Sequence, residues 1–296
     1  MSEAVTHTAV LDDAFRLMLA GAVACPAFQS AAQAHWDVAR LGAVTRSGDH
    51  VSVPLLDALR AQRAAGQPEE GWAPKLAFVL GVLCHRAADR QMKPLFRALE
   101  PDSARSPTEC SIYHDVFLLR EVYGDEEPFR AEMFADPPGS SAGPSASAVE
   151  DLFQALLARA LVQMHTLIPD AGDPEGWLER LLAARQRFRV ELPRYAAAIA
   201  SPDPLKLGLY IQEPNFYDPA DALIGAARRI QHGEPVAPDA LQLALRSEPA
   251  SHYAQALRLA LGYLDAASEF FSGEISAQAL RRRLDIGEPG RDGRSV

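Results

Sequence analysis

The chain has 296 residues, of which 48% are hydrophobic, which is enough for one large domain or two ordinary ones around a sizeable core. Its formal net charge of −10 argues against nucleic acid as a partner, because binding a phosphate backbone requires a basic surface. The three cysteines, Cys25, Cys84 and Cys110, lack the spacing of a zinc clip or a disulfide framework, and this usage is typical of a reducing compartment.

The apolar runs of the chain fall short of the ~18 residues that a transmembrane span requires. Near the N-terminus, Asp12 and Asp13 interrupt the one stretch that could serve as the apolar region of a signal peptide, and no basic residues precede it. We therefore expect a cytoplasmic protein without a transmembrane segment. Nothing in the sequence indicates its oligomeric state.

Helical periodicity dominates the chain, and no stretch shows the alternation of a strand. Thr6 and His7 stand where a cap of the first helix would lie, and the turn residues of 45–50 separate the second helix from the third. Pro94 is expected to break or kink the fourth helix, because proline lacks a backbone donor. The helices expected in this part of the chain are 8–24, 28–43, 52–65 and 76–94.

Loops are expected at 101–108, where prolines and serines gather, and at 136–148, whose Pro, Gly and Ser content predicts a mobile connection. The proline-rich segment 201–221 is expected to be irregular. Further helices are expected at 109–123, 149–168, 174–192, 220–231, 238–246 and 250–272. These elements predict an all-α fold in one multi-helical domain, 1–285, with a metal-site half (1–135), the mobile loop and a second helical half (149–285), followed by a flexible tail (286–296).

His85 and Asp89 are the first candidates for chemistry. Their spacing of four places both side chains on one face of the expected helix, about one turn apart, and the apolar residues around them indicate that this face is buried. Two interpretations fit: the imidazole and the carboxylate satisfy each other in the core, or they bind a metal. Cys84 lies about 100° around the helix from His85 and is expected to point into the core.

Further His and Asp residues occur in the same part of the chain, and each alone has an ordinary explanation. A turn aspartate such as Asp49, beside His50, is usually a cap or a turn former. His7 is close to the N-terminus, where side chains are solvated by default, and the adjacent His114 and Asp115 diverge on a helix. Taken together, His nitrogens and Asp oxygens suit a divalent metal, with Zn²⁺ the first choice and Fe or Mn as alternatives. The candidate ligands are His7, Asp49, His85, Asp89 and His114.

The order of these residues resembles the zinc-dependent phospholipase C-like family, which includes the P1 nuclease type. The resemblance covers roughly residues 1–120 and consists of Thr6-His7, the segment Leu-Gly-Ala at 41–43 that leads to Asp49, and LAFVLGVLCHRAAD at 76–89. It implies a phospholipase C-like helical bundle that hydrolyses phosphodiesters, often of phospholipids, with catalytic metal ions. The ligands that the resemblance implies are His7, Asp49, His85 and Asp89.

The chain departs from the family pattern at three places. Lys93 stands before Pro94, where the family has a histidine, and glycine replaces the proline of the family's Pro-Asp before Asp49. The later His-x-x-x-Glu of the family is replaced by a segment with Cys110 and His114 four residues apart. These departures predict fewer metal ions than in the family, or none.

The sequence thus favours a metal-dependent hydrolase of phosphoesters or phosphodiesters, with a metal-activated water and a small phosphoester or phospholipid as substrate. Asp115, if uncoordinated, would orient the water or take its proton. One alternative is a non-catalytic helical scaffold or partner-binding protein that has lost the full site. Another is an HD-type phosphohydrolase, in which both His114 and Asp115 would bind the metal.

Overall fold

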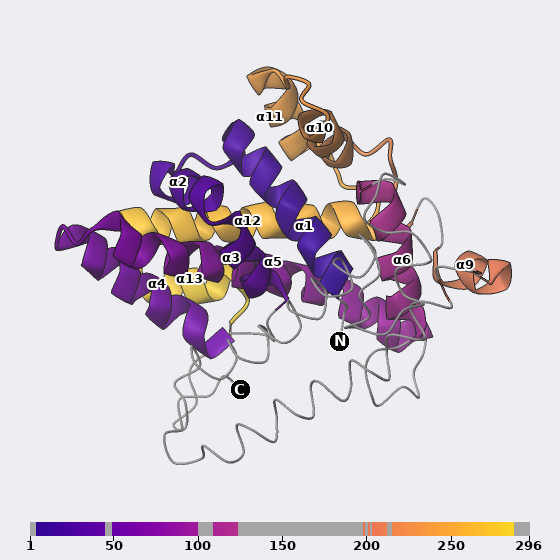
Figure 1. The fold of residues 1–296 in the computed structure, drawn as a ribbon, viewed down its shortest axis with the longest axis horizontal. Coiled ribbons are helices and arrows are strands. Elements are labelled where there is room, and N and C mark those ends of the chain that lie inside the picture. The colour runs from indigo at the N-terminus through magenta and orange to yellow at the C-terminus, as the bar shows by residue number, and fades with distance from the viewer. Residues whose placement is uncertain are drawn as a thin grey trace, which may run out of the picture.

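The structure is a computed structural model of the chain (Figure 1), and it describes residues 4–44, 49–99, 109–123, 203–211 and 215–286, with Ala198 and Ser201. Every regular element within these ranges is helical, which confirms the expected all-α class. The segments expected at 101–108, 136–148, 149–168 and 174–192, and all of the expected tail except Ile286, lie outside the described residues.

The first part of the chain contains α1 (Ala4–Leu17), a π-helical segment (Met18–Ala22), α2 (Pro26–Ala34), α3 (Trp36–Ala43), α4 (Asp49–Ala64), α5 (Glu69–Leu99) and α6 (Glu109–Tyr123). The second part contains α9 (Pro204–Tyr210), α10 (Ala222–Gln231), α11 (Pro238–Arg246), α12 (His252–Ser272) and α13 (Ala277–Arg283). Among these described helices, none has both the length and the apolar character needed to cross a bilayer.

The two longest helices, α5 and α12, pack against each other and organise the core. Figure 1 shows α1 lying across α12, with α10 and α11 to one side and α4 and α13 to the other. The caps of α12 fit its sequence: the Ser251 side chain accepts from the backbone N–H of Ala254, and Gly273 ends the helix in the left-handed region at φ 89°. Helix α1 packs against α5, α6, α10 and α12, so its inward face contributes to several interfaces.

Helix α3 crosses α5 at very short range because a glycine stands on each side of the crossing. A Cβ atom on Gly42 would lie 2.1 Å from the carbonyl oxygen of Phe78, and one on Gly81 would lie 1.9 Å from that of Ala39. Only glycine allows two helix backbones to approach this closely. The crossing brings the carboxyl end of α3 beside the middle of α5.

Proline positions account for two corrections to the expected helices. Pro94 does not end its helix, because α5 continues to Leu99. An interior proline costs about 3 kcal/mol, but the flanking Met92 and Phe96 are buried, and burying two large apolar side chains offsets that cost at about 1.5–3 kcal/mol each. The proline-rich segment 201–221 is not wholly irregular, because Pro204 opens α9 and Asp203 caps it by accepting from the N–H of Leu205.

The first two expected helices also differ from those observed. The expected helix 28–43 is two helices, α2 and α3, because the backbone leaves the helical region at His35, at φ −137° and ψ 43°. His7 does not precede its helix as a cap residue, because α1 already begins at Ala4. His7 is also not solvated, since only 1% of it is exposed.

Candidate metal centre

The candidate site is built on the middle of α5. His85 Nε2 lies 3.1 Å from Asp89 Oδ2, and the two residues are 2% and 7% exposed. The expectation from their spacing of four, that both side chains lie on one buried face, is therefore confirmed. Cys84 is fully buried in the core, as expected, and burial raises the pKa of its thiol.

Helix α1 brings a second imidazole to the same carboxylate. His7 Nε2 lies 3.3 Å from Asp89 Oδ1, so each carboxylate oxygen faces one histidine nitrogen. The His7 and His85 rings are stacked, with centroids 4.1 Å apart and planes 13° from parallel. In the described part of the chain, these three residues form the one group of three or more His, Cys, Asp or Glu side chains that could share an ion, with ligand atoms within 4.8 Å of one another.

The carboxyl end of α3 fixes the orientation of His85. Its Nδ1 lies 2.8 Å from the carbonyl oxygen of Ala43, and because a carbonyl only accepts, Nδ1 must carry the proton. In the neutral ring the lone pair is then on Nε2, towards Asp89, whereas in the protonated ring Nε2–H donates to Asp89 Oδ2. A backbone carbonyl that holds one ring nitrogen while the other faces the ion is the usual arrangement of a histidine ligand.

Asp89 is ionised at neutral pH. Burial acts to raise its pKa, but His85 and His7 outweigh this effect and hold the pKa well below its usual range. An imidazole nitrogen this close to a carboxylate oxygen needs a positive charge between the two, either a proton on the imidazole or a bound cation. The three side chains therefore form a site for positive charge.

This donor set fits a divalent metal. Zinc is bound by imidazole nitrogens and carboxylate oxygens at about 2.0–2.2 Å, so neighbouring ligand atoms of a tetrahedral ion lie about 3.3–3.5 Å apart. The 3.3 and 3.1 Å separations here join the two histidines to different oxygens of Asp89, and one ligand atom from each of the three residues lies within 4.8 Å of the others. Three protein ligands with a fourth position left for water or substrate are typical of catalytic zinc sites.

A lysine also contacts the same carboxylate. Lys93, one turn beyond Asp89 on α5, has its Nζ 2.5 Å from Asp89 Oδ2. The Lys93 side chain is 41% exposed, whereas the side chain of Asp89 is 8% exposed. The residue noted in the sequence as a departure from the family pattern thus places its charge at the site.

Asp115 holds the end of α1 that carries His7. Its Oδ1 accepts from the backbone N–H of Thr6 at 2.7 Å and from the Thr6 hydroxyl at 2.5 Å, and its Oδ2 accepts from the N–H of Val5 at 3.3 Å. A carboxylate at a helix N-terminus satisfies free N–H groups and complements the helix dipole. Asp115 therefore anchors the first turn of α1, and the catalytic role expected for it stays a prediction.

His114 is not part of the three-residue group. Its Nε2 lies 2.9 Å from the carbonyl oxygen of Tyr210, and its ring stacks on Phe216 with centroids 3.9 Å apart. Burial lowers its pKa to about 4. His114 and Asp115 thus contact different parts of the chain, Asp115 the start of α1 and His114 the end of α9, as expected for adjacent residues on a helix.

The remaining expected ligand, Asp49, begins α4, but its side chain lies outside the described part of the structure, as does that of His50. Its role as a ligand stays a prediction. The structure thus brings together His7, His85 and Asp89 of the five expected ligands and does not place His114 with them.

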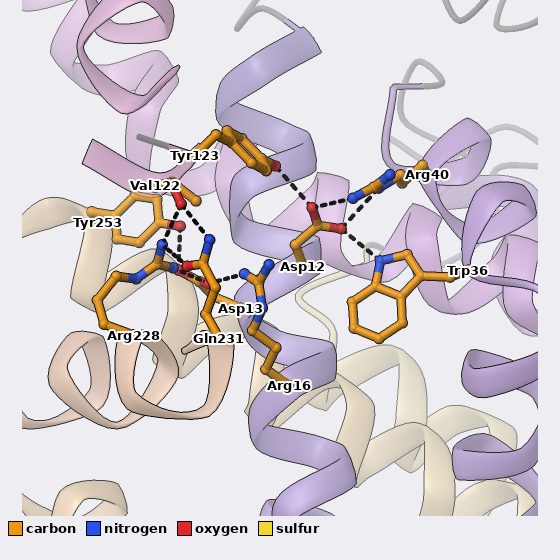
Figure 2. A network of polar contacts seen from close by, with 10 residues as sticks. All are labelled: Asp12, Asp13, Arg16, Trp36, Arg40, Val122, Tyr123, Arg228, Gln231 and Tyr253. Atoms are coloured by element: carbon orange, nitrogen blue, oxygen red, sulfur yellow. Dashed lines mark hydrogen bonds and ion pairs between the residues drawn. The ribbon is translucent and has the colours of Figure 1, made fainter. Parts of the chain in front are cut away.

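A second buried polar centre, missed in the sequence, lies further along α1. Figure 2 shows Asp12 between three donors: its carboxylate accepts from Trp36 Nε1 at 2.6 Å, from Arg40 Nε at 3.0 Å and Nη2 at 2.7 Å, and from the Tyr123 hydroxyl at 2.9 Å. Asp12 is fully buried. It therefore ties α3 and α6 to α1.

Asp13 ties α10 and α12 to the other side of α1. It accepts from Arg16 at 2.7 Å, from the Tyr253 hydroxyl at 2.7 Å and from Arg228 (Figure 2). Burial raises its pKa, and the two arginines oppose that shift. The signal in the sequence was two adjacent acidic residues inside an apolar helical stretch, which we had used only to argue against a signal peptide.

No protein family, curated protein or solved structure matches the chain in the comparisons. The resemblance to the phospholipase C-like family therefore rests on motif order alone. The case for a metal centre rests on the geometry of His7, His85 and Asp89.

Proposed function

We propose that the chain is a metal-dependent hydrolase of phosphoesters or phosphodiesters, with zinc as the first candidate ion and Fe or Mn as alternatives. The observation that carries the proposal is the arrival of His7 from α1 at the His85/Asp89 pair of α5, which completes a buried donor set of two nitrogens and one carboxylate. A core His–Asp pair needs no third residue, whereas a metal does. The order of the motifs supports a phospholipase C-like bundle and a small phosphoester or phospholipid as the substrate.

A bound divalent ion would supply a Lewis acid and a water whose pKa is lowered to ~7. His7, His85 and Asp89 would hold it, and the carbonyl of Ala43 keeps His85 Nε2 directed at it. Asp115 positions His7 through its contacts with Thr6. All three side chains are buried, so little water would lie between them and a bound ion. The electrostatic attraction between the ion and these side chains would be stronger as a result.

Metal analysis and phosphodiesterase assays of the purified protein test the proposal, with bis-p-nitrophenyl phosphate and p-nitrophenyl phosphocholine as substrates. We expect one equivalent of bound Zn²⁺ after reconstitution and hydrolysis that is lost on chelation. His85→Ala removes a ligand and is expected to weaken binding about 100-fold or more, whereas His232→Ala, at an exposed position after α10, is the matched control. Less than about a tenth of an equivalent bound to the wild type would contradict the proposal.

The second candidate is a non-catalytic scaffold or partner-binding protein. The observation that favours it is Lys93, whose ammonium can neutralise Asp89 without any metal. The double variant His85→Ala/Asp89→Ala separates the two functions. Loss of hydrolysis at an unchanged melting temperature supports the enzyme, and a lower melting temperature with no hydrolysis to lose supports the scaffold.

A further inference from the structure

Asp89 contacts two kinds of nitrogen, and only one of them can leave. The imidazoles of His7 and His85 are buried and stacked, and His85 is also held by the carbonyl of Ala43. Lys93 instead reaches Asp89 Oδ2 at the end of a flexible chain whose side chain is 41% exposed. Its ammonium can therefore turn from the carboxylate to water without repacking the core.

The position of the ammonium conflicts with that of a metal ion. Lys93 Nζ and His85 Nε2 approach the same oxygen, Asp89 Oδ2, at 2.5 and 3.1 Å. An ion held by His85 and Asp89 would bind at that oxygen and would place a second positive charge beside the ammonium. Two cations on one partly buried carboxylate oxygen repel each other strongly, because little water screens them.

We infer that the Lys93 ammonium is the resident counter-ion of this site, and that a metal binds His7, His85 and Asp89 only by displacing it. The inference rests on the proposed function, because it concerns the affinity of the same metal site. Lys93 then sets how tightly the site holds a metal, although it is not itself a ligand. Loss of its charge leaves Asp89 Oδ2 without its ammonium partner, which favours an incoming cation.

The test is the affinity for Zn²⁺ and Co²⁺, measured by competition with a chromophoric chelator and by the absorption of the Co²⁺ protein. Lys93→Met keeps an unbranched side chain that is one atom shorter and removes its charge, and we expect it to tighten binding about tenfold or more. Lys93→Arg keeps a cation and should not tighten binding. Lys75→Met, at an exposed position of α5, controls for net charge.

The outcomes separate the inference from the proposed function. Tighter metal binding by Lys93→Met than by the wild type supports the inference. If Lys93→Met binds a metal and the wild type binds none, the proposed hydrolase fails while the inference stands. Equal or weaker binding by Lys93→Met, when the wild type binds, overturns the inference and leaves the proposed function intact. Absence of binding by both proteins overturns both. Lys93→Gln is the second variant if Lys93→Met does not give the helical circular dichroism of the wild type.

Discussion

Helix α1 contributes to two buried acidic centres that are neutralised in different ways. At Asp12 and Asp13, each carboxylate faces an arginine that cannot lose its charge, together with aromatic O–H or N–H donors. At Asp89, the partners are two imidazoles and a half-exposed lysine. The first centre has fixed counter-charges and holds helices together, whereas the second has exchangeable ones, as binding an ion requires.

The same substitution in both centres tests this difference most severely. Asp13→Asn leaves the Arg228 guanidinium, only 16% exposed, without its counter-charge, and we expect the free energy of unfolding to fall by about 3–5 kcal/mol. Asp89→Asn, the matched change, should cost less, about 1–3 kcal/mol, because the ammonium of Lys93 can turn to water and the amide can still hydrogen-bond the two imidazoles. Urea denaturation of the metal-free proteins measures both, and equal losses would remove the distinction between the centres.

His114 extends the comparison to a buried imidazole that contacts a backbone carbonyl instead of a carboxylate. Burial lowers its pKa from the ordinary 6.5 to about 4, so the unfolded chain takes up this proton at a higher pH than the folded one does. The neutral imidazole therefore stabilises the folded protein fully above pH 6.5, and this stabilisation is lost as the pH falls towards 4. The total loss in the free energy of unfolding is about 3 kcal/mol, because a pKa change of one is worth ~1.4 kcal/mol.

Unfolding measured between pH 7 and pH 4 tests this expectation, with His114→Phe as the comparison. Phenylalanine keeps a ring against Phe216 but cannot bind a proton. The wild type should lose about 3 kcal/mol more than the variant as the pH falls from 7 to 4. Parallel pH profiles would show that His114 is not the group responsible.

The smallest expected effect concerns the close crossing of α3 and α5, which supports the candidate metal centre. Gly81→Ala forces α3 away from α5, because the added Cβ would lie 1.9 Å from the carbonyl oxygen of Ala39, and we expect a loss of about 1–3 kcal/mol. Metal affinity should fall as well, because the shift moves the carbonyl of Ala43 from His85. Gly262→Ala, where no atom lies within 4 Å of the added Cβ, is the control, and it should be neutral or stabilising by up to about 1 kcal/mol. Equal effects of the two substitutions would contradict the close crossing.

The features that the sequence predicts correctly are local ones. The spacing of His85 and Asp89 follows from the helical repeat, so their shared face could be derived without any knowledge of the fold. The contact of His7 with Asp89 joins residues 82 apart, and it was suggested by residue type and by the resemblance to a known motif order, not by spacing. The spacing of residues within one helix cannot predict such a contact, because the distance between the two side chains depends on how α1 packs against α5.

The errors have the same origin. Asp13 and Arg228 are 215 residues apart, so no local pattern could identify a fixed ion pair in what looked like an interrupted apolar stretch. Local geometry predicts a break or a kink at Pro94, but the helix continues to Leu99, and burial of nearby apolar side chains outweighs the preference for a break. His114 looked like a ligand by type and position, and only the packing of α6 shows that its ring faces Tyr210 and Phe216.

The backbone carbonyl that orients His85 has a consequence for mutational tolerance. Every amino acid carries that carbonyl, so a substitution at Ala43 that fits the available space leaves the acceptor in place. The positions sensitive to substitution are instead Gly42 and Gly81, which are not candidate ligands but set how far apart the two backbones lie. A saturation scan scored by metal binding should therefore find its least tolerant positions outside the ligand set at these two glycines, where even a methyl group has no room.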